Sequence, residues 1–218
     1  MKYKLVSFDL MGSLIKSDEH IWNVIHDKLG VDPEERKNAY NDFKEGRISY
    51  QDWVAHNVNL WAKKGATKDD LMDAVAELEL QEGALETLQR LKNNHCLIIL
   101  SGGLNFVIEK IFRQHQTLFD HVFINKLVFG EGGLIAGGKA TPYDMDKKAD
   151  SLRLVAEQEG IDISQCVFVG NNKNDIEVAK IAGLSIAFNS KSDELSEVCN
   201  VAVNSDSLVS ILDYILVE

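Results

Sequence analysis

The feature that most constrains the fold is a set of short, continuous apolar runs separated by stretches with helical periodicity. The runs cover residues 5–8, 97–100, 167–169, 185–188 and 200–203, and the amphipathic stretches cover residues 104–113, 144–159, 175–182 and 207–216. Runs without alternating polar residues predict strands buried on both faces, as in a parallel sheet covered by helices. The alternation therefore predicts an α/β fold with a doubly wound parallel sheet. Residues 119–137, with apolar runs around Gly130 and Gly132, predict a small β-hairpin.

The long segment between the first two predicted strands carries helix signals and no convincing strand. Asp32 before Pro33 is typical of a helix start, because aspartate caps the first turn and proline fits its first position. Ser49 and Thr67 each precede an aspartate by three residues, as in a capping box. The simplest interpretation is a helical cap inserted after the first strand. The predicted division is a cap domain at residues 15–80 and a Rossmann-like core domain at residues 1–14 and 81–218.

The charge balance argues against two classes of partner. Lysine and arginine total 23 and aspartate and glutamate 34, so the net charge is −11, which disfavours nucleic acid and anionic membranes. The longest apolar runs are far shorter than the roughly 20 residues that a membrane helix needs, and no signal peptide is visible. Three cysteines form neither a CxxC pair nor an even disulfide set. We therefore expect a cytoplasmic protein, and its oligomeric state is left open.

Polar residues follow three of the predicted strands, at the edge where an open parallel sheet binds ligands. They are Asp9 after the first strand, Ser101, Gly102 and Gly103 after the second, and Asn171, Asn174 and Asp175 after the strand at residues 167–169. The Ser101 segment, at a predicted helix N-terminus, suits an anion such as phosphate. Lys148 opens the preceding helix, from where its ammonium could reach the same edge. Each feature alone has a structural explanation as a cap, a turn or a surface charge, but together they favour phosphate chemistry.

These segments resemble the haloacid dehalogenase superfamily of hydrolases and, within it, the phosphoserine phosphatase branch. The likeness runs over nearly the whole chain, including cap residues 45–50 and core residues 182–189. It rests on Phe8-Asp9 with Gly12-Ser13, Leu100-Ser101-Gly102-Gly103, Lys148-Ala149-Asp150-Ser151-Leu152, and Val169-Gly170 with Asn174-Asp175. The resemblance implies a phosphatase that acts on a small phosphorylated metabolite through an aspartyl-phosphate intermediate, with Mg²⁺ as its cofactor.

The resemblance also implies a role for each matching residue. Asp9 would be the nucleophile and Lys148 would neutralise charge. Ser101 and Gly102 would bind the phosphoryl oxygens, with Gly103 and Asn174 as further substrate contacts. Asp9, the backbone carbonyl of Met11, Asn171 and Asp175 would hold the magnesium ion. A carboxylate attacks phosphorus only where the repulsion between anions is cancelled, and a lysine, an anion nest and a divalent cation supply that cancellation.

Several positions depart from the family's pattern. Met11 stands where the family's phosphatases carry the aspartate that acts as general acid, and a thioether has no proton to donate. Asn171 replaces the aspartate expected as a direct magnesium ligand, so we expect weaker magnesium binding. In the cap, Asn57 stands where the branch places an arginine that grips the substrate carboxylate. Asp18 falls at a cap glutamate and Glu19 follows it, as an amine partner or a substitute acid.

Three functions fit this pattern. The leading hypothesis is a phosphatase-type hydrolase whose activity is reduced because Met11 and Asn171 replace aspartates. The second is a metal-independent hydrolase like the superfamily's dehalogenases, which also have a bulky residue at the position of Met11. The third is a catalytically impaired protein that binds a phosphate ligand and serves a regulatory role. Magnesium-dependent turnover of an aryl phosphate would separate the first function from the other two.

Overall fold

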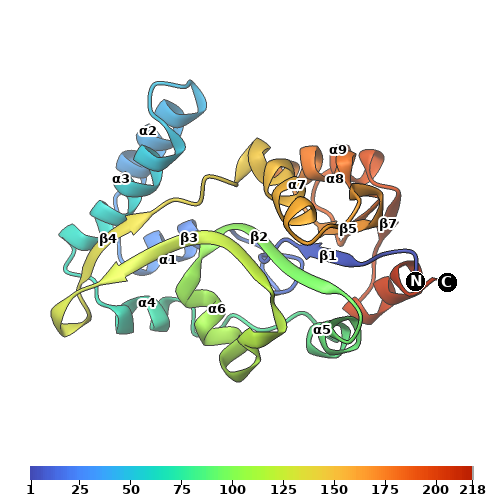
Figure 1. Cartoon of the computed structure of the whole chain (residues 1–218). Helices are drawn as coiled ribbons and strands as arrows, with labels where there is room; N and C mark the ends of the chain where they lie inside the picture. Colours follow the sequence, from blue (N-terminus) through green and yellow to red (C-terminus); the bar gives the residue numbers. More distant parts are fainter. Residues whose placement is uncertain (218) are drawn as a thin grey trace.

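The computed structural model describes residues 1–217, except for the side chain of Asp146. Its centre is a seven-stranded sheet in the order β4-β3-β2-β1-β5-β6-β7 (Figure 1). The strands are β1 (Leu5–Phe8), β2 (Cys96–Leu104), β3 (His121–Phe129), β4 (Ile135–Lys139), β5 (Cys166–Gly170), β6 (Leu184–Phe188) and β7 (Val201–Val203). Every pairing is parallel except that of β3 with β4, which is antiparallel. The predicted α/β class, the parallel sheet and the hairpin are therefore confirmed.

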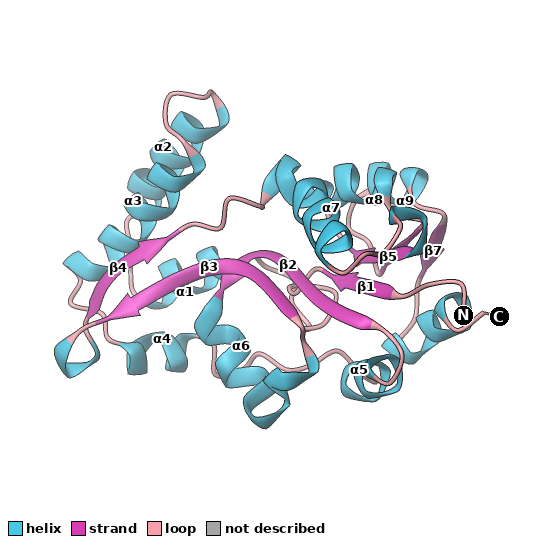
Figure 2. Ribbon diagram, in the orientation of Figure 1, coloured by secondary structure: helices cyan, strands magenta, loops and turns pink. Residues whose placement is uncertain are grey.

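Helices cover both faces of this sheet (Figure 2). One face carries α7 (Lys148–Gln158), α8 (Ile176–Ile181) and α9 (Asp193–Val198), and the other carries α5 (Ala84–Lys92), α6 (Asn105–Phe112) and α10 (Leu212–Ile215). Neighbouring strand residues belong to different apolar clusters: Leu5 packs with the α7 side, whereas Val6 packs with the α5 side. Two buried faces explain why the strands read as unbroken apolar runs. None of the described helices has the length and apolar character needed to cross a membrane.

Four helices lie between β1 and α5 in the chain: α1 (Ile21–Lys28), α2 (Pro33–Lys44), α3 (Tyr50–Lys63) and α4 (Lys68–Ala74). The predicted helix starts are confirmed, since Asp32 accepts a hydrogen bond from the backbone N–H of Glu34, and capping boxes begin at Ser49 and Thr67. An antiparallel bridge between Ile15 and Leu80 closes the base of this segment. The division into a cap at residues 15–80 and a core stays a prediction.

The four helices α1–α4, called the cap below, are linked to the sheet by the β3–β4 hairpin. Helix α3 lies against β4, where Gly138 leaves room for the side chain of Val58. The side-chain oxygen of Gln51 on α3 accepts a hydrogen bond of 2.9 Å from the backbone N–H of Ala140, just after β4. The hairpin therefore holds the cap helix beside the edge of the sheet, which positions the residues at the start of α3 for the site described below.

Two sequence predictions about the elements differ from the structure. Ser101, Gly102 and Gly103 lie inside β2 and not at a helix N-terminus, because β2 resumes pairing with β3 at Leu104 after a register shift, and α6 begins at Asn105. Helix α9 did not stand out in the sequence. Short 3-10 turns are Arg113–Leu118, Glu131–Gly133, Met145–Lys147, Ile163–Gln165, Lys173–Asp175 and Leu208–Ile211. Those at Met145–Lys147 and Leu208–Ile211 replace the first turns of the helices predicted at residues 144–159 and 207–216.

The cap has a polar contact buried in its own interior. Nδ1 of His26 accepts a hydrogen bond of 2.9 Å from the indole N–H of Trp61, so the ring proton is on Nε2, 2.7 Å from Oδ1 of Asn57. The side-chain amide of Asn57 in turn donates to the carbonyl of Trp53 at 2.7 Å. Burial lowers the pKa of His26 to about 4. The neutral imidazole is thus part of what holds α1 against α3.

We predict that the stability of the protein falls on acidification partly because of His26. Between pH 6.5 and about 4 the unfolded chain binds a proton at this residue and the folded chain does not, so stability rises with pH across that window. One such proton gives a slope of at most about 1.4 kcal/mol per pH unit. The free energy of unfolding, measured with urea at several pH values, should depend less steeply on pH in His26→Gln than in the unaltered chain, by up to this amount. The glutamine amide offers an acceptor and N–H donors in place of the imidazole. Equal slopes would contradict this assignment.

Candidate active site

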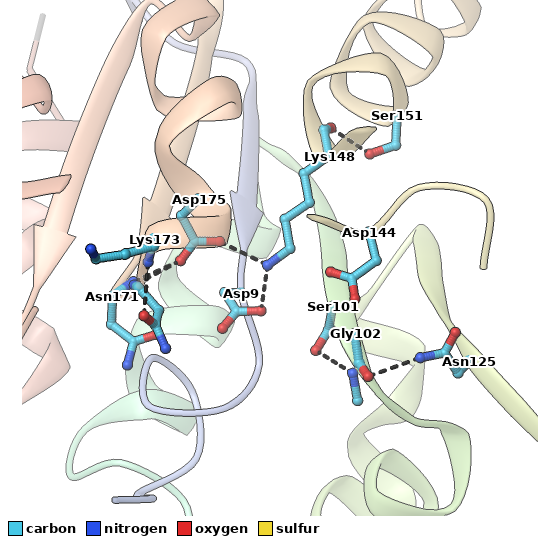
Figure 3. A network of polar contacts seen from close by, with 12 residues as sticks. Asp9, Ser101, Gly102, Asn125, Asp144, Lys148, Ser151, Asn171, Lys173 and Asp175 are labelled. Atoms are coloured by element: carbon cyan, nitrogen blue, oxygen red, sulfur yellow. Dashed lines mark hydrogen bonds and ion pairs between the residues drawn. The ribbon is translucent and has the colours of Figure 1, made fainter. Parts of the chain in front are cut away.

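The candidate site is built around the Lys148 side chain, which reaches from the first residue of α7 to the ends of two strands (Figure 3). Its ammonium nitrogen donates to Oδ1 of Asp9 at 2.9 Å and to Oδ1 of Asp175 at 2.7 Å. Asp9 follows β1, and Asp175 ends the short turn after β5. Because β1 and β5 are adjacent and parallel, their carboxyl ends bring the two carboxylates to one point.

Burial sets four charged residues, called the Lys148 cluster below, apart from the other Asp, Glu, Lys and Arg residues that the structure describes. The buried aspartate, glutamate, lysine and arginine residues are Asp9, Asp144, Lys148 and Asp175. Lys148 and Asp175 are fully buried, and Asp9 is 6% exposed. Unpaired charges are costly in an apolar interior, so charged residues are buried only where they are paired or serve a function. If all four are ionised, the cluster carries two negative charges in excess.

Burial and the neighbouring charges shift the pKa of both Lys148 and Asp9. Burial alone would lower the pKa of Lys148, but the carboxylates of Asp175 and Asp9 outweigh it and raise the pKa, so the ammonium stays charged. Burial raises the pKa of Asp9 to about 7, although Lys148 opposes the shift. Lys148 thus shares one positive charge between two carboxylates. A further cation beside Asp9 would lower its pKa and favour the carboxylate form.

The loop after β5 supplies oxygen atoms next to Asp9. Oδ2 of Asp175 accepts the backbone N–H groups of Asn171 at 2.9 Å and of Asn172 at 3.1 Å, which fixes the loop. The Asn171 side chain packs against Gly12, which has a φ of 83° and whose missing Cβ would overlap that amide. Oδ1 of Asn171 is buried and has no hydrogen-bond partner among the described residues.

This set of donors fits a magnesium ion. Oδ1 of Asn171 takes part in no hydrogen bond among residues 1–217, and an unpartnered buried oxygen calls for a cation or a water. Carboxylate and amide oxygens are the ligand type that Mg²⁺ prefers. Both oxygens of Asp175 are occupied by Lys148 and the loop. Asp9 and Asn171 are therefore better placed than Asp175 to hold the ion directly.

The Ser101 segment lies on the next strand of the sheet, β2. Ser101 is buried, and its hydroxyl oxygen accepts the backbone N–H of Gly103 at 3.1 Å. The carbonyl of Gly102 accepts two bonds, from the indole N–H of Trp22 at 3.0 Å and from the amide of Asn125 at 2.8 Å. Trp22 is on α1, so a cap helix touches the segment that the sequence assigns to phosphoryl binding.

A second link between cap and core was missed by the sequence reasoning. Tyr50, the first residue of α3, donates its hydroxyl to Oδ2 of Asp144 at 2.6 Å and accepts the amide of Asn125 at 2.9 Å. Burial first, and then the neighbouring Asp144, raise the pKa of Tyr50. Tyr50 also stacks on Trp53, with ring centroids 5.8 Å apart. Nothing in the sequence around Asp144 and Asn125 distinguished them from ordinary loop and strand residues.

Two predicted substrate contacts from the cap are engaged elsewhere. Asn57 is buried inside the cap, with its amide bonded to His26 and Trp53, so it is a packing residue in this conformation. Asp18 is exposed at the surface and pairs with Lys191 at 3.0 Å. Asn57 finds its partners on α1 and α3, and Asp18 pairs with a lysine in the loop after β6, so both side chains are engaged away from Lys148.

Two other predicted residues lie next to the cluster in the chain. Asn174 is half-buried, and its side chain makes no hydrogen bond within the described part of the chain. Met11 is partly buried and packs against the apolar core. The carbonyl of Met11 accepts none of the hydrogen bonds found among the described residues, because the turn closes through Leu10 and Ile15. That oxygen is free for the role that the family resemblance implies.

Comparison with known proteins agrees with this geometry. The family model for haloacid dehalogenase-like hydrolases matches residues 14–180. The phosphoserine phosphatase of Methanocaldococcus jannaschii is 30% identical over 215 residues, which is 98% of this chain and 98% of that protein. The phosphoserine phosphatase of Lactococcus lactis is 26% identical over 97% of this chain and 94% of its own.

Solved structures give the same result. A structure described as a phospho-aspartyl intermediate analogue of phosphoserine phosphatase has a TM-score of 0.76 and 30% identity, covering 99% of this chain and 100% of its own. A substrate-bound phosphoserine phosphatase has a TM-score of 0.77 and 29% identity, covering 99% of both chains. The chain therefore belongs to the haloacid dehalogenase-like hydrolases, in the branch that resembles phosphoserine phosphatases.

Proposed function

We propose that the protein hydrolyses small phosphate monoesters, with Asp9 as the nucleophile and Mg²⁺ as the cofactor. The observation that carries this proposal is the position of Asp9 at the end of β1, where its carboxylate bonds to the buried ammonium of Lys148. The similarity to a phospho-aspartyl intermediate analogue supports the same residue type in the same role.

The reaction has two steps. In the first, a carboxylate oxygen of Asp9 attacks phosphorus, the ester P–O bond breaks, and the alcohol part leaves with the electron pair. In the second, water attacks the phosphorus of the aspartyl-phosphate and releases inorganic phosphate and the Asp9 carboxylate. Lys148 reduces the repulsion between Asp9 and the incoming phosphate, and Ser101 offers its hydroxyl to a phosphoryl oxygen. When bound by Asp9, Asn171 and the Met11 carbonyl, magnesium supplies Lewis-acid polarisation of the phosphoryl group.

The substitution at Met11 limits the range of substrates. An alkoxide leaves slowly unless an acid protonates it, and a positioned acid contributes about 10²- to 10⁴-fold in rate. The Met11 thioether packs into the core and has no proton to donate. We therefore infer that aryl and acyl phosphates, whose leaving groups depart without protonation, are hydrolysed faster than alkyl phosphates. The similarity to phosphoserine phosphatases favours a phosphatase over the dehalogenase-like alternative.

Magnesium-dependent hydrolysis of 4-nitrophenyl phosphate tests the proposed function, because its leaving group needs no acid. We expect steady release of nitrophenolate by the unaltered chain, its loss in excess EDTA, and its loss in Asp9→Asn, which removes the nucleophilic charge. Asp150→Asn, the same change at an exposed residue of α7, should keep the full rate. Turnover that is equal in Asp9→Asn and in the unaltered chain would remove Asp9 from the role. Beryllium fluoride binding without turnover would favour a phosphate-binding protein.

The double variant Met11→Asp with Asn171→Asp tests whether these two positions account for the reduced activity. It supplies a proton carrier and a charged magnesium ligand, so we expect at least about a 10²-fold gain in hydrolysis of an alkyl phosphate. Met11→Asn with Asn171→Asp is the matched control, because it has a side chain of similar size and polarity but no proton to give. A folded double variant that binds magnesium yet gains nothing over this control would show that the missing acid is not what limits the reaction.

A further inference from the structure

One buried charge of the cluster has no part in the reaction described above. Asp144 lies in the loop before α7 and is 7% exposed. Figure 3 shows its carboxylate between Lys148 and the segment of Ser101 and Gly102. The carboxylate packs so closely on Gly102 that a Cβ at this position would overlap it. Asp144 is also near enough to Lys148 to contribute to the rise in the pKa of that lysine.

The two oxygens of Asp144 differ in their surroundings. Oδ2 accepts the hydroxyl of Tyr50 at 2.6 Å. Oδ1 is buried and has no partner among the described residues. A buried acceptor left unsatisfied destabilises the protein, more so when the group is charged, so such an atom calls for a donor that arrives from outside.

None of the neighbouring donors among the described residues bonds to Oδ1. The hydroxyl of Tyr50 is committed to Oδ2, and the amide of Asn125 is committed to Tyr50 and to the Gly102 carbonyl. Lys148 donates to Asp9 and Asp175. Next to the Ser101 segment, the Asp144 carboxylate, held by Tyr50, therefore has one oxygen free to accept a hydrogen bond.

We propose that Asp144 determines substrate specificity by binding an ammonium group on the alcohol part of the phosphate ester. This inference rests on the proposed function, because it takes the phosphoryl group to lie at Ser101 and Gly102. With the phosphoryl group there, the alcohol part extends toward the cap side of the segment, where Tyr50 holds Asp144. An ammonium there satisfies Oδ1 and offsets the excess negative charge of the cluster, whereas a carboxylate in the same place is repelled.

Three phosphonates that carry different groups on the same two-carbon linker test the proposal without depending on turnover, since a P–C bond is not hydrolysed in this reaction. They are 2-aminoethylphosphonate, propylphosphonate and 2-carboxyethylphosphonate, titrated calorimetrically into the full chain in the presence of magnesium. We expect the amine to bind at least about tenfold tighter than the propyl compound, and the carboxylate to bind most weakly. In Asp144→Asn the three affinities should come within about threefold of one another. Asp150→Asn is again the matched control and should keep the preference.

The ranking on the unaltered chain decides the proposal even if Asp144→Asn does not fold. An amine that binds no better than the propyl compound, a carboxylate that binds best, or binding of none of the three overturns it. A preference for the amine that persists in folded Asp144→Asn also overturns it. Magnesium-dependent hydrolysis of 4-nitrophenyl phosphate, which carries no ammonium group, separately reports whether the proposed phosphatase function stands.

Discussion

The interaction on which the site depends is the buried contact of one lysine with two aspartates. Lys148, Asp9 and Asp175 come from α7 and from the ends of β1 and β5, and none of them would be stable in this interior without the others. Removing one partner from such a cluster leaves uncompensated buried charge, which typically costs 3–5 kcal/mol. The cluster therefore ties the sheet to α7 while keeping a carboxylate available beside oxygen donors suited to magnesium.

The cap contributes to this site through polar contacts as well as through apolar packing. Trp22 of α1 bonds to the Gly102 carbonyl, and Tyr50 of α3 bonds to Asp144, so both helices contact the edge of the sheet next to the Lys148 cluster. Aromatic stacking of Trp22 on Trp61, with centroids 5.2 Å apart, joins α1 to α3 behind these contacts. The cluster is almost completely buried in this arrangement.

Much of the fold was predictable because its signals are local. Apolar runs, caps and capping boxes each act within a few residues, and they were sufficient for the parallel sheet, the hairpin and the starts of the cap helices. The residues brought to the site by the strand ends, Asp9 and Asp175, follow from topology alone. The sequence did not indicate which residues from other parts of the chain would join them. Tyr50 and Asp144 are 94 positions apart and meet only because β4 carries the cap helix to the core. Asn57 satisfies its amide within the cap, which no local pattern indicates.

The central claim is that Lys148 compensates two buried carboxylates and thereby creates the site. The most direct measurement is the free energy of unfolding of Lys148→Met compared with Lys147→Met, its exposed neighbour in the chain. We expect Lys148→Met to lose about 3–5 kcal/mol relative to that control at neutral pH. The loss should shrink as the pH falls, because protonation of Asp9, whose pKa burial raises to about 7, removes uncompensated charge. A loss equal to that of Lys147→Met at every pH would contradict the account.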